Sequence, residues 1–137
     1  MIILDTDVLS AAMHSEIAVA VWLDRQPRTS IWTTAVTVLE IRYGLLTTSP
    51  GRRRLERETA FANILEEKLE RRVLPFDQAA AEAAAVLMEA RRRVGRPREV
   101  RDTMIAGIAL AQRATLATRN VRHFDDLDVP VVDPWQV

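Results

Sequence analysis

The chain has 137 residues, 48% of them hydrophobic and 28% charged, and a formal net charge of zero. This length and composition predict one globular domain spanning 1–137, large enough to bury a hydrophobic core. It contains no cysteine and only two histidines, which excludes disulfides and thiolate metal sites. No apolar run reaches the roughly 18 residues of a membrane span, and the N-terminus lacks a signal-peptide pattern, so we expect a cytoplasmic protein with no membrane association.

Hydrophobic periodicity predicts strands that alternate with helices along the chain. Such alternation is typical of an α/β fold, with a mostly parallel sheet of four to five strands covered by helices on both faces. In chain order we predict a strand at 2–4, helices at 7–13 and 16–25, a strand at 29–34, helices at 36–47 and 52–72, a strand at 72–76, helices at 77–94 and 101–114, and strands at 115–118 and 129–133, the last at an edge.

Two acids one residue apart, Asp5 and Asp7, follow directly after the first predicted strand. In open parallel sheets, ligands bind beyond the carboxyl ends of the strands, so this position favours a functional role. Capping of the following helix is the alternative. It suits Asp7 better than Asp5, which we expect to lie beside the buried core.

Two further acids occur where a structural explanation is incomplete. Glu40 lies within an apolar helix, where a carboxylate costs several kcal/mol unless a positive partner meets it. That partner could be Arg42 or a metal ion, or Glu40 could lie on an exposed stripe. Asp102 opens the helix at 101–114, where the helix dipole alone could explain it. If Asp5, Glu40 and Asp102 converge, their oxygen ligands would select Mg²⁺ or Mn²⁺.

Arginine supplies 18 of the 19 basic residues, and Lys68 is the only lysine. The arginines cluster at 51–57 and 91–101, with Arg119 and Arg122 near the end of the chain. Guanidinium groups suit bidentate contacts to phosphate. A compositional bias with solvated helix faces explains each cluster equally well.

Several motifs in order along the chain resemble those of PIN-domain proteins, and closely those of the VapC toxin ribonucleases of type II toxin–antitoxin pairs. The resemblance covers essentially the whole chain. It implies a PIN-like three-layer α/β/α fold. The motifs are "LDTDVLS", "TTAVTVLEIRYGL", "RDTMIAGIALAQRATLATRN", "TRNVRHF" and "VVDPW".

The resemblance implies an endoribonuclease that needs Mg²⁺ (or Mn²⁺), hydrolyses RNA phosphodiester bonds and inhibits translation and growth. It assigns the catalytic acids to Asp5, Glu40 and Asp102, with Asn120 at a more variable fourth position that Asp125 could fill instead. All three acids would hold the metal, and Glu40 would also take the proton of the attacking water. The remaining assignments are Thr6 and Asp7 as supporting residues, Arg119 and Arg122 as RNA contacts, and His123 as either a substrate contact or a surface residue.

The resemblance also implies a cognate antitoxin whose C-terminal tail covers the acidic groove. We further expect a homodimer formed through apolar stripes in the helices at 36–72, and a hetero-oligomer with the antitoxin. Two alternative functions remain: a haloacid-dehalogenase-like phosphatase, and a PIN-fold binding module with vestigial acids. The phosphatase requires a downstream lysine, and the only lysine lies in an amphipathic helix.

Overall fold

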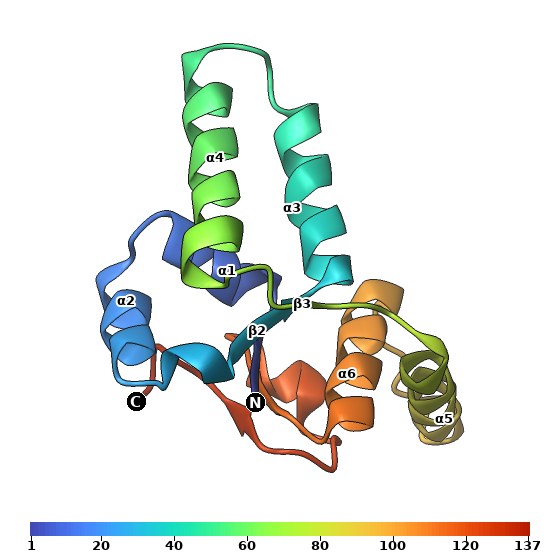
Figure 1. Ribbon diagram of the computed structural model, residues 1–137. Helices are drawn as coiled ribbons and strands as arrows, with labels where there is room; N and C mark the ends of the chain where they lie inside the picture. Colours follow the sequence, from blue (N-terminus) through green and yellow to red (C-terminus); the bar gives the residue numbers. More distant parts are fainter.

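The structure is a computed structural model that describes residues 1–137. Its centre is a five-stranded sheet in the order β3-β2-β1-β4-β5, in which every neighbouring pair is parallel (Figure 1). The predicted parallel sheet, including its short edge strand, is therefore confirmed. The strands are β1 (Ile2–Leu4), β2 (Ile31–Thr34), β3 (Val73–Leu74), β4 (Thr115–Ala117) and β5 (Val131–Val132).

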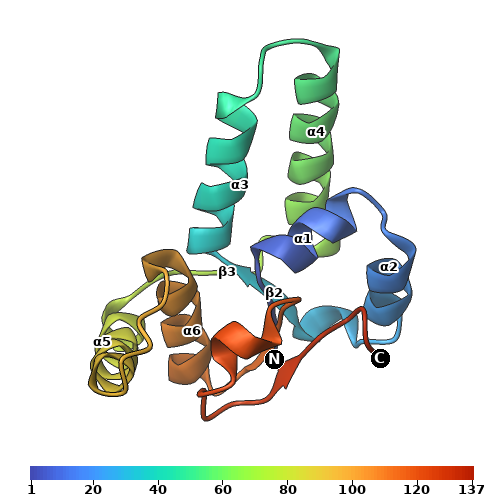
Figure 2. The ribbon, with the colours of Figure 1, turned by 180° about the vertical axis from the view of Figure 1, so that it is seen from behind.

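Helices cover both faces of this sheet, which confirms the three-layer α/β/α architecture. Helices α1, α2 and α4 pack on one face, and α5 and α6 pack on the other. Helices α3 and α4 also form a hairpin that projects away from the sheet, as Figures 1 and 2 show from opposite sides. The helices are α1 (Thr6–Met13), α2 (Ile17–Asp24), α3 (Ala35–Thr47), α4 (Arg52–Asn63), α5 (Gln78–Arg93) and α6 (Val100–Gln112), with short helical segments η1 (Arg28–Ser30), η2 (Ile64–Lys68) and η3 (Val121–Phe124).

The side chains of β1 alternate between the two faces of the sheet and contribute to two separate parts of the core. Successive side chains of a strand point to opposite faces of the sheet. Leu4 accordingly packs with Ile31 and Ala117 beneath α1, α2 and α4, whereas Ile3 packs with Leu116 beneath α5 and α6. Because both faces are buried, the central strand is a continuous apolar run rather than an alternating one.

Helices α5 and α6 pack closely because their contact residues are small. A Cβ atom added to Gly107 of α6 would lie 2.5 Å from the carbonyl oxygen of Ala80 and 2.8 Å from the Cβ of Ala84, both in α5. This contact explains the small residues of the "DTMIAGIALA" segment. It also anchors the helix that carries Asp102.

Apart from shifts of one or two residues at the ends of elements, three local details differ from the predictions. The helix predicted at 52–72 is α-helical only to Asn63 and continues as the π-helical turn η2, where the Leu69 N–H donates to the Ile64 carbonyl 2.9 Å away. The wider turn keeps both Ile64 and Leu69 in the core. The two short 3₁₀ helices differ from the predictions as well. Helix η1 overlaps the start of the strand predicted at 29–34, and η3 lies where no helix or strand was predicted. None of the helices has both the length and the apolar character needed to cross a bilayer.

Candidate functional site

The site lies at the carboxyl edge of the sheet, where the direction of strand addition reverses. The chain passes from β1 to β2 and β3 on one side, and later adds β4 and β5 on the other side of β1. Ligands of open parallel sheets bind at such a switch point. Asp5 directly follows β1, and Asn120 follows β4, its neighbour in the sheet.

Asp5 is almost completely buried, with 6% of its surface exposed, and it begins α1. Its Oδ1 accepts a hydrogen bond from the Val8 N–H at 3.0 Å, so Asp5 is the N-cap residue of α1. The expectation that capping would fall to Asp7 rather than Asp5 is therefore wrong. The reason is that α1 begins at Thr6, one residue earlier than predicted.

The pKa of Asp5 is raised to about 7. Burial of the carboxyl group is the main cause, and the negative charges of Asp7 and Asp102 add to it. Hydrogen bonds from Thr118 and the Val8 N–H act in the opposite direction. These acids are thus close enough to repel one another, although they come from separate parts of the sequence.

Asp7 and Asn120 meet across the same edge. The Asn120 amide nitrogen Nδ2 donates to Asp7 Oδ2 at 3.1 Å, and the Asn120 N–H donates to the Thr118 hydroxyl oxygen at 3.0 Å. The contact between Asn120 and Asp7 joins the segment after β4 to the start of α1. Asn120 therefore reaches the site through its contact with Asp7. Asp125 lies exposed at the end of η3.

Glu40 reaches the site from the second turn of α3. The Thr6 hydroxyl donates to Glu40 Oε1 at 2.7 Å, and Arg101 Nη1 lies 3.9 Å from Glu40 Oε2. The side chain of Glu40 is 19% exposed, so the exposed-stripe alternative is wrong. Arg42 as its partner is also wrong, because the Arg42 guanidinium lies over the ring of Phe61, 5.1 Å from its centroid. Residues two apart on a helix do not face the same side.

Asp102 lies in the first turn of α6 and is half-buried. The cap of this helix is Glu99, whose carboxylate accepts the Asp102 N–H at 3.1 Å. Burial raises the pKa of Asp102, and the charge of Glu99 adds to this effect. Asp102 Oδ2 also lies 3.8 Å from Nδ1 of His123, a half-exposed residue of η3. Asp102 is therefore not the cap, although it lies in the first turn, where the helix dipole favours an acid.

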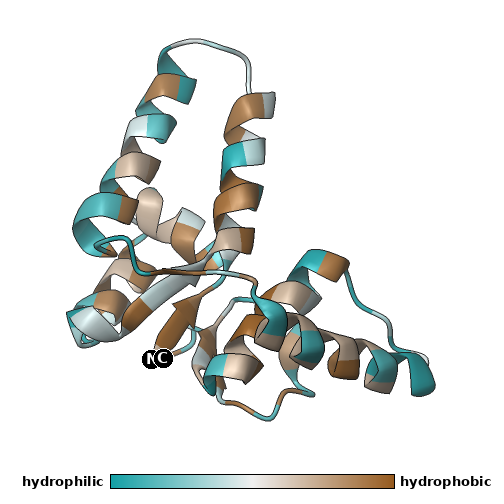
Figure 3. Ribbon diagram, turned by 45° about the vertical axis from the view of Figure 1, so that its right-hand side comes forward, coloured by the Kyte–Doolittle hydropathy of each residue, from teal (hydrophilic) through white to brown (hydrophobic).

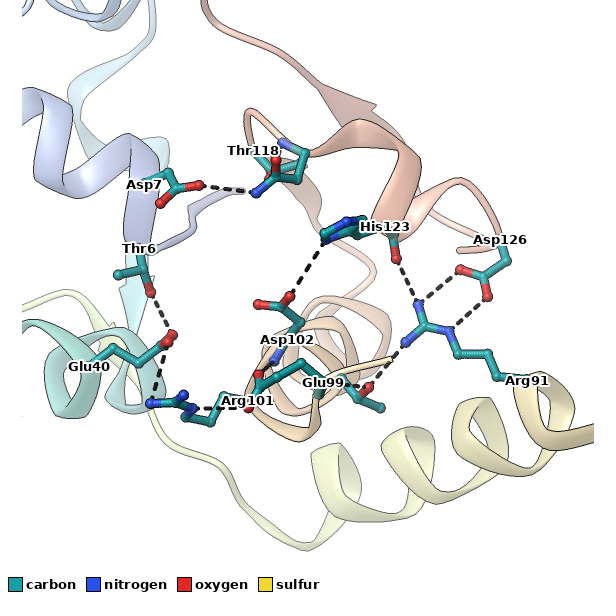
Figure 4. Close-up of polar contacts among 12 residues, drawn as sticks. Thr6, Asp7, Glu40, Arg91, Glu99, Arg101, Asp102, Thr118, His123 and Asp126 are labelled. Carbon is teal, nitrogen blue, oxygen red and sulfur yellow. Dashed lines mark hydrogen bonds and ion pairs between the residues drawn. The ribbon is translucent and has the colours of Figure 1, made fainter. Parts of the chain in front are cut away.

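Figure 4 shows Asp7, Glu40 and Asp102 around one space, and Asp5 and Asn120 adjoin it through their interactions with Asp102 and Asp7. We call the space bordered by these five residues the acidic hollow. Its donors are oxygen atoms, which favour hard cations such as Mg²⁺ and Mn²⁺. No three of the acidic or histidine side chains lie close enough together to hold a metal ion between them. Mg²⁺ commonly keeps several waters and binds through one or two carboxylates. The raised pKa values and the donor set fit such a hydrated cation.

The arginines near the hollow have different roles from one another. Arg119 stacks on the ring of Trp135, 4.5 Å from its centroid, and Arg122 is exposed in η3. Arg101 is half-exposed between Glu40 and Glu99.

Arg91 contradicts the expectation of a solvated or phosphate-binding cluster at 91–101. Its exposed surface is only 2%, and it forms an ion pair with Asp126. The sequence contained a signal for this burial, because the buried residues of α5 recur at helical spacing. They are Ala80, Ala84, Leu87 and Arg91.

The comparisons with known proteins agree with this geometry. The family model described as PIN domain matches residues 2–130. The chain is 36% identical over 142 residues to "VapC ribonuclease Y4jK" of Sinorhizobium fredii, with 99% of each chain covered. It is 31% identical over 145 residues to "Toxin FitB" of Neisseria gonorrhoeae, covering 98% of this chain and 99% of FitB. The solved structure of FitAB bound to an IR36 DNA fragment matches with a TM-score of 0.89 and 29% identity, covering 100% of this chain and 97% of that one.

Proposed function

The chain belongs to the PIN-domain family, and we propose that it is the toxin of a toxin–antitoxin pair, an endoribonuclease that depends on Mg²⁺ or Mn²⁺. One observation supports this proposal: Asp5 interacts with the charge of Asp102, and Thr6, the next residue, donates to Glu40, so acids from three separate segments meet at the carboxyl edge of the sheet. Relatives similar over nearly their whole length are named as a VapC ribonuclease and as a toxin.

In the proposed mechanism, Asp5 and Asp102 would hold the divalent cation, with Glu40 beside them. When bound, the cation would neutralise charge on the phosphate and on the leaving oxygen. Glu40 acts as the general base that takes the proton of the attacking water. Its Oε1 is fixed by the Thr6 hydroxyl at 2.7 Å, which orients the carboxylate toward the hollow.

Asp7 and Asn120 support these acids. Asn120 donates to Asp7 at 3.1 Å and holds it at the rim of the hollow. This role suits an amide, because an amide nitrogen can donate to a carboxylate where a second carboxylate would repel it. We therefore assign the fourth position of the site to Asn120 rather than to the exposed Asp125.

RNA would approach the hollow past exposed arginines. Arg122 and the half-exposed Arg101 lie in segments adjoining Asn120 and Asp102. Arg119 is stacked on Trp135, and its guanidinium keeps donors free for a phosphate. A basic rim around an acidic centre lets a polyanion bind without neutralising the acids, so a net charge of zero is compatible with RNA as the substrate.

The antitoxin would cover the acidic hollow with its C-terminal tail, since a basic side chain would be attracted to the clustered carboxylates. An open groove of about 620 Å³ offers it a second contact surface. Both apolar and polar side chains line the groove. Among its lining residues are Ala12, Met13, Leu23, Ile64, Glu67 and Leu69.

The hairpin of α3 and α4 supports a two-fold homodimer. Leu39, Tyr43, Leu46 and Leu55 are each more than half exposed, at 56%, 62%, 59% and 64%. Figure 3 shows hydrophobic segments along both arms of the hairpin. Apolar surface that one small domain leaves exposed is typical of a contact between protein chains.

The test is cleavage of single-stranded RNA by the purified chain, free of antitoxin, in Mg²⁺ or Mn²⁺ and in EDTA. We expect cleavage that EDTA abolishes. Asp5→Ala and Asp102→Ala should each lower the rate by about 100-fold or more while the protein stays folded, because they remove charge stabilisation worth several kcal/mol. Asp128→Ala, at an exposed position, is the matched control.

Three outcomes would contradict the proposal. Cleavage at the wild-type rate by both variants would mean that the site is assigned to the wrong residues. Release of phosphate from small phosphomonoesters without RNA cleavage would favour the phosphatase alternative. Tight binding of a partner with no hydrolysis of either substrate would favour the binding module.

A further inference from the structure

The guanidinium of Arg91 is buried at a junction of three segments. Its side chain is 3% exposed, and its nitrogens donate four hydrogen bonds to three residues. Nε and Nη2 donate to the two carboxylate oxygens of Asp126 at 2.8 and 3.0 Å, and Nη2 also donates to the His123 carbonyl at 3.0 Å (Figure 4). Nη1 donates to the Thr103 hydroxyl at 3.0 Å.

Two of these contacts are made to residues that lie beside Asp102, at the border of the acidic hollow. Thr103 follows Asp102 in the first turn of α6, and its hydroxyl also donates to the Glu99 carbonyl at 3.1 Å. His123 belongs to η3, and its ring lies 3.8 Å from Asp102. Arg91 therefore links the backbone of η3 to the helix turn that carries Asp102.

We propose that Arg91 is a positioning residue for the acidic hollow: by joining the start of α6 to η3, it holds Asp102 at the place where the divalent cation binds. This inference rests on the proposed function. Asp126 fixes the orientation of the guanidinium through two parallel hydrogen bonds. The planar fork of arginine is required, because a lysine has neither the bidentate geometry nor enough donors in one plane to reach all three partners.

If Arg91 only stabilised the fold, its replacement would have a different effect on metal binding. The loss of folded protein lowers the number of binding sites and the maximal rate, but it leaves the affinity of each folded molecule for the metal unchanged. Loss of positioning lowers the affinity itself. Residues that orient metal ligands from behind typically change metal affinity or activity by about 10- to 100-fold when they are replaced.

The experiment measures Mn²⁺ binding to the full chain by calorimetry, in the absence of RNA, at a temperature where circular dichroism shows every variant folded. The test variants are Arg91→Lys and Asp126→Asn. The Asp126 side chain is 41% exposed, so its substitution remains informative if Arg91→Lys does not fold. The matched controls are Arg92→Lys, one residue away in a 73% exposed surface pair with Glu89, and the exposed Asp128→Asn. Asp102→Asn is the reference for direct loss of a ligand.

We expect Arg91→Lys and Asp126→Asn to weaken Mn²⁺ binding by at least about 10-fold. The Mg²⁺ concentration for half-maximal RNA cleavage should rise by a similar factor, while both controls bind as the wild type does. Wild-type Mn²⁺ affinity in both test variants would overturn the positioning role and leave the proposed function intact. Mn²⁺ binding by a wild-type chain that cleaves no RNA would refute the nuclease but not the positioning role. A wild-type chain that binds neither Mn²⁺ nor Mg²⁺ would refute both.

Discussion

Asp5→Asn should stabilise the metal-free protein at neutral and alkaline pH. The Asp5 carboxyl is buried near two other acids, which raises its pKa to about 7 from an ordinary value of 3.8. Asparagine removes the charge and keeps a side-chain oxygen that can accept the Val8 N–H, so the N-cap of α1 survives. The substitution therefore isolates the cost of ionising Asp5.

The sign and size of the effect follow from this pKa. Well below pH 3.8, the carboxyl is protonated in both the folded and the unfolded chain, and Asp5 does not change the free energy of unfolding. As the pH rises toward 7, the unfolded chain ionises first, so the free energy of unfolding falls, and above about pH 7 the loss is constant. At about 1.4 kcal/mol per pKa unit, a shift of about three units corresponds to about 4 kcal/mol, and relaxation of the site lowers this to a few kcal/mol.

The measurement is urea unfolding of both proteins in EDTA at several pH values from 4 to 8. The free energy of unfolding of Asp5→Asn should exceed that of the wild type by a few kcal/mol at pH 8, and the difference should shrink to below about 1 kcal/mol at pH 4. Acids remote from Asp5 titrate alike in both proteins and cancel in the difference. Asp5→Ala should gain less, because it also loses a cap worth about 1 kcal/mol.

Addition of Mg²⁺ provides the second half of the test. A cation that binds the folded wild type stabilises it in proportion to the logarithm of its concentration, whereas the variant has lost a ligand and should respond weakly. The advantage of Asp5→Asn should therefore shrink as Mg²⁺ is added. A difference in stability that is independent of pH between 4 and 8, or equal in EDTA and Mg²⁺, would refute the reasoning.

Three further predictions concern the RNA path, the dimer and the core. Arg119→Ala or Arg122→Ala should weaken RNA binding, and each lost phosphate contact should reduce the slope of log affinity against log salt concentration by roughly 0.7, whereas Arg53→Ala should do neither. Affinity titrations at several salt concentrations measure this, in Ca²⁺ if that ion blocks cleavage. Leu46→Glu should convert a dimer into a monomer in light scattering at high micromolar concentration, and a wild-type monomer there would count against the dimer. Gly107→Ala should lower the free energy of unfolding by about 1–3 kcal/mol, since its Cβ would lie 2.5 Å from the Ala80 carbonyl, and unchanged thermal stability would show that α5 can move away.

Much of the architecture could be predicted from local sequence patterns. Strands and helices alternate visibly because each has its own hydrophobic period, and the parallel sheet follows from that alternation. The acids could be found for a related reason. Asp5 follows a strand, and parallel strands end at the same edge of the sheet, so a polar residue there predicts a site. The boundary of α1 was less predictable, and a shift of one residue gave the cap to Asp5 instead of Asp7.

The sequence by itself determined the order of the elements, and it pointed to the carboxyl edge as the place of the candidate site and to the acids that we assign to it. Only the tertiary structure decided how these side chains pair. Glu40 lies near Arg101 and not Arg42, Asn120 contacts Asp7 across 113 positions of the chain, and Arg91 is buried against Asp126. The pKa of Asp5 also belongs to this level, because it depends on burial and on charges brought in by distant segments. Local periodicity fixes which face of an element is apolar, but the partners of a polar group are set by how whole elements pack.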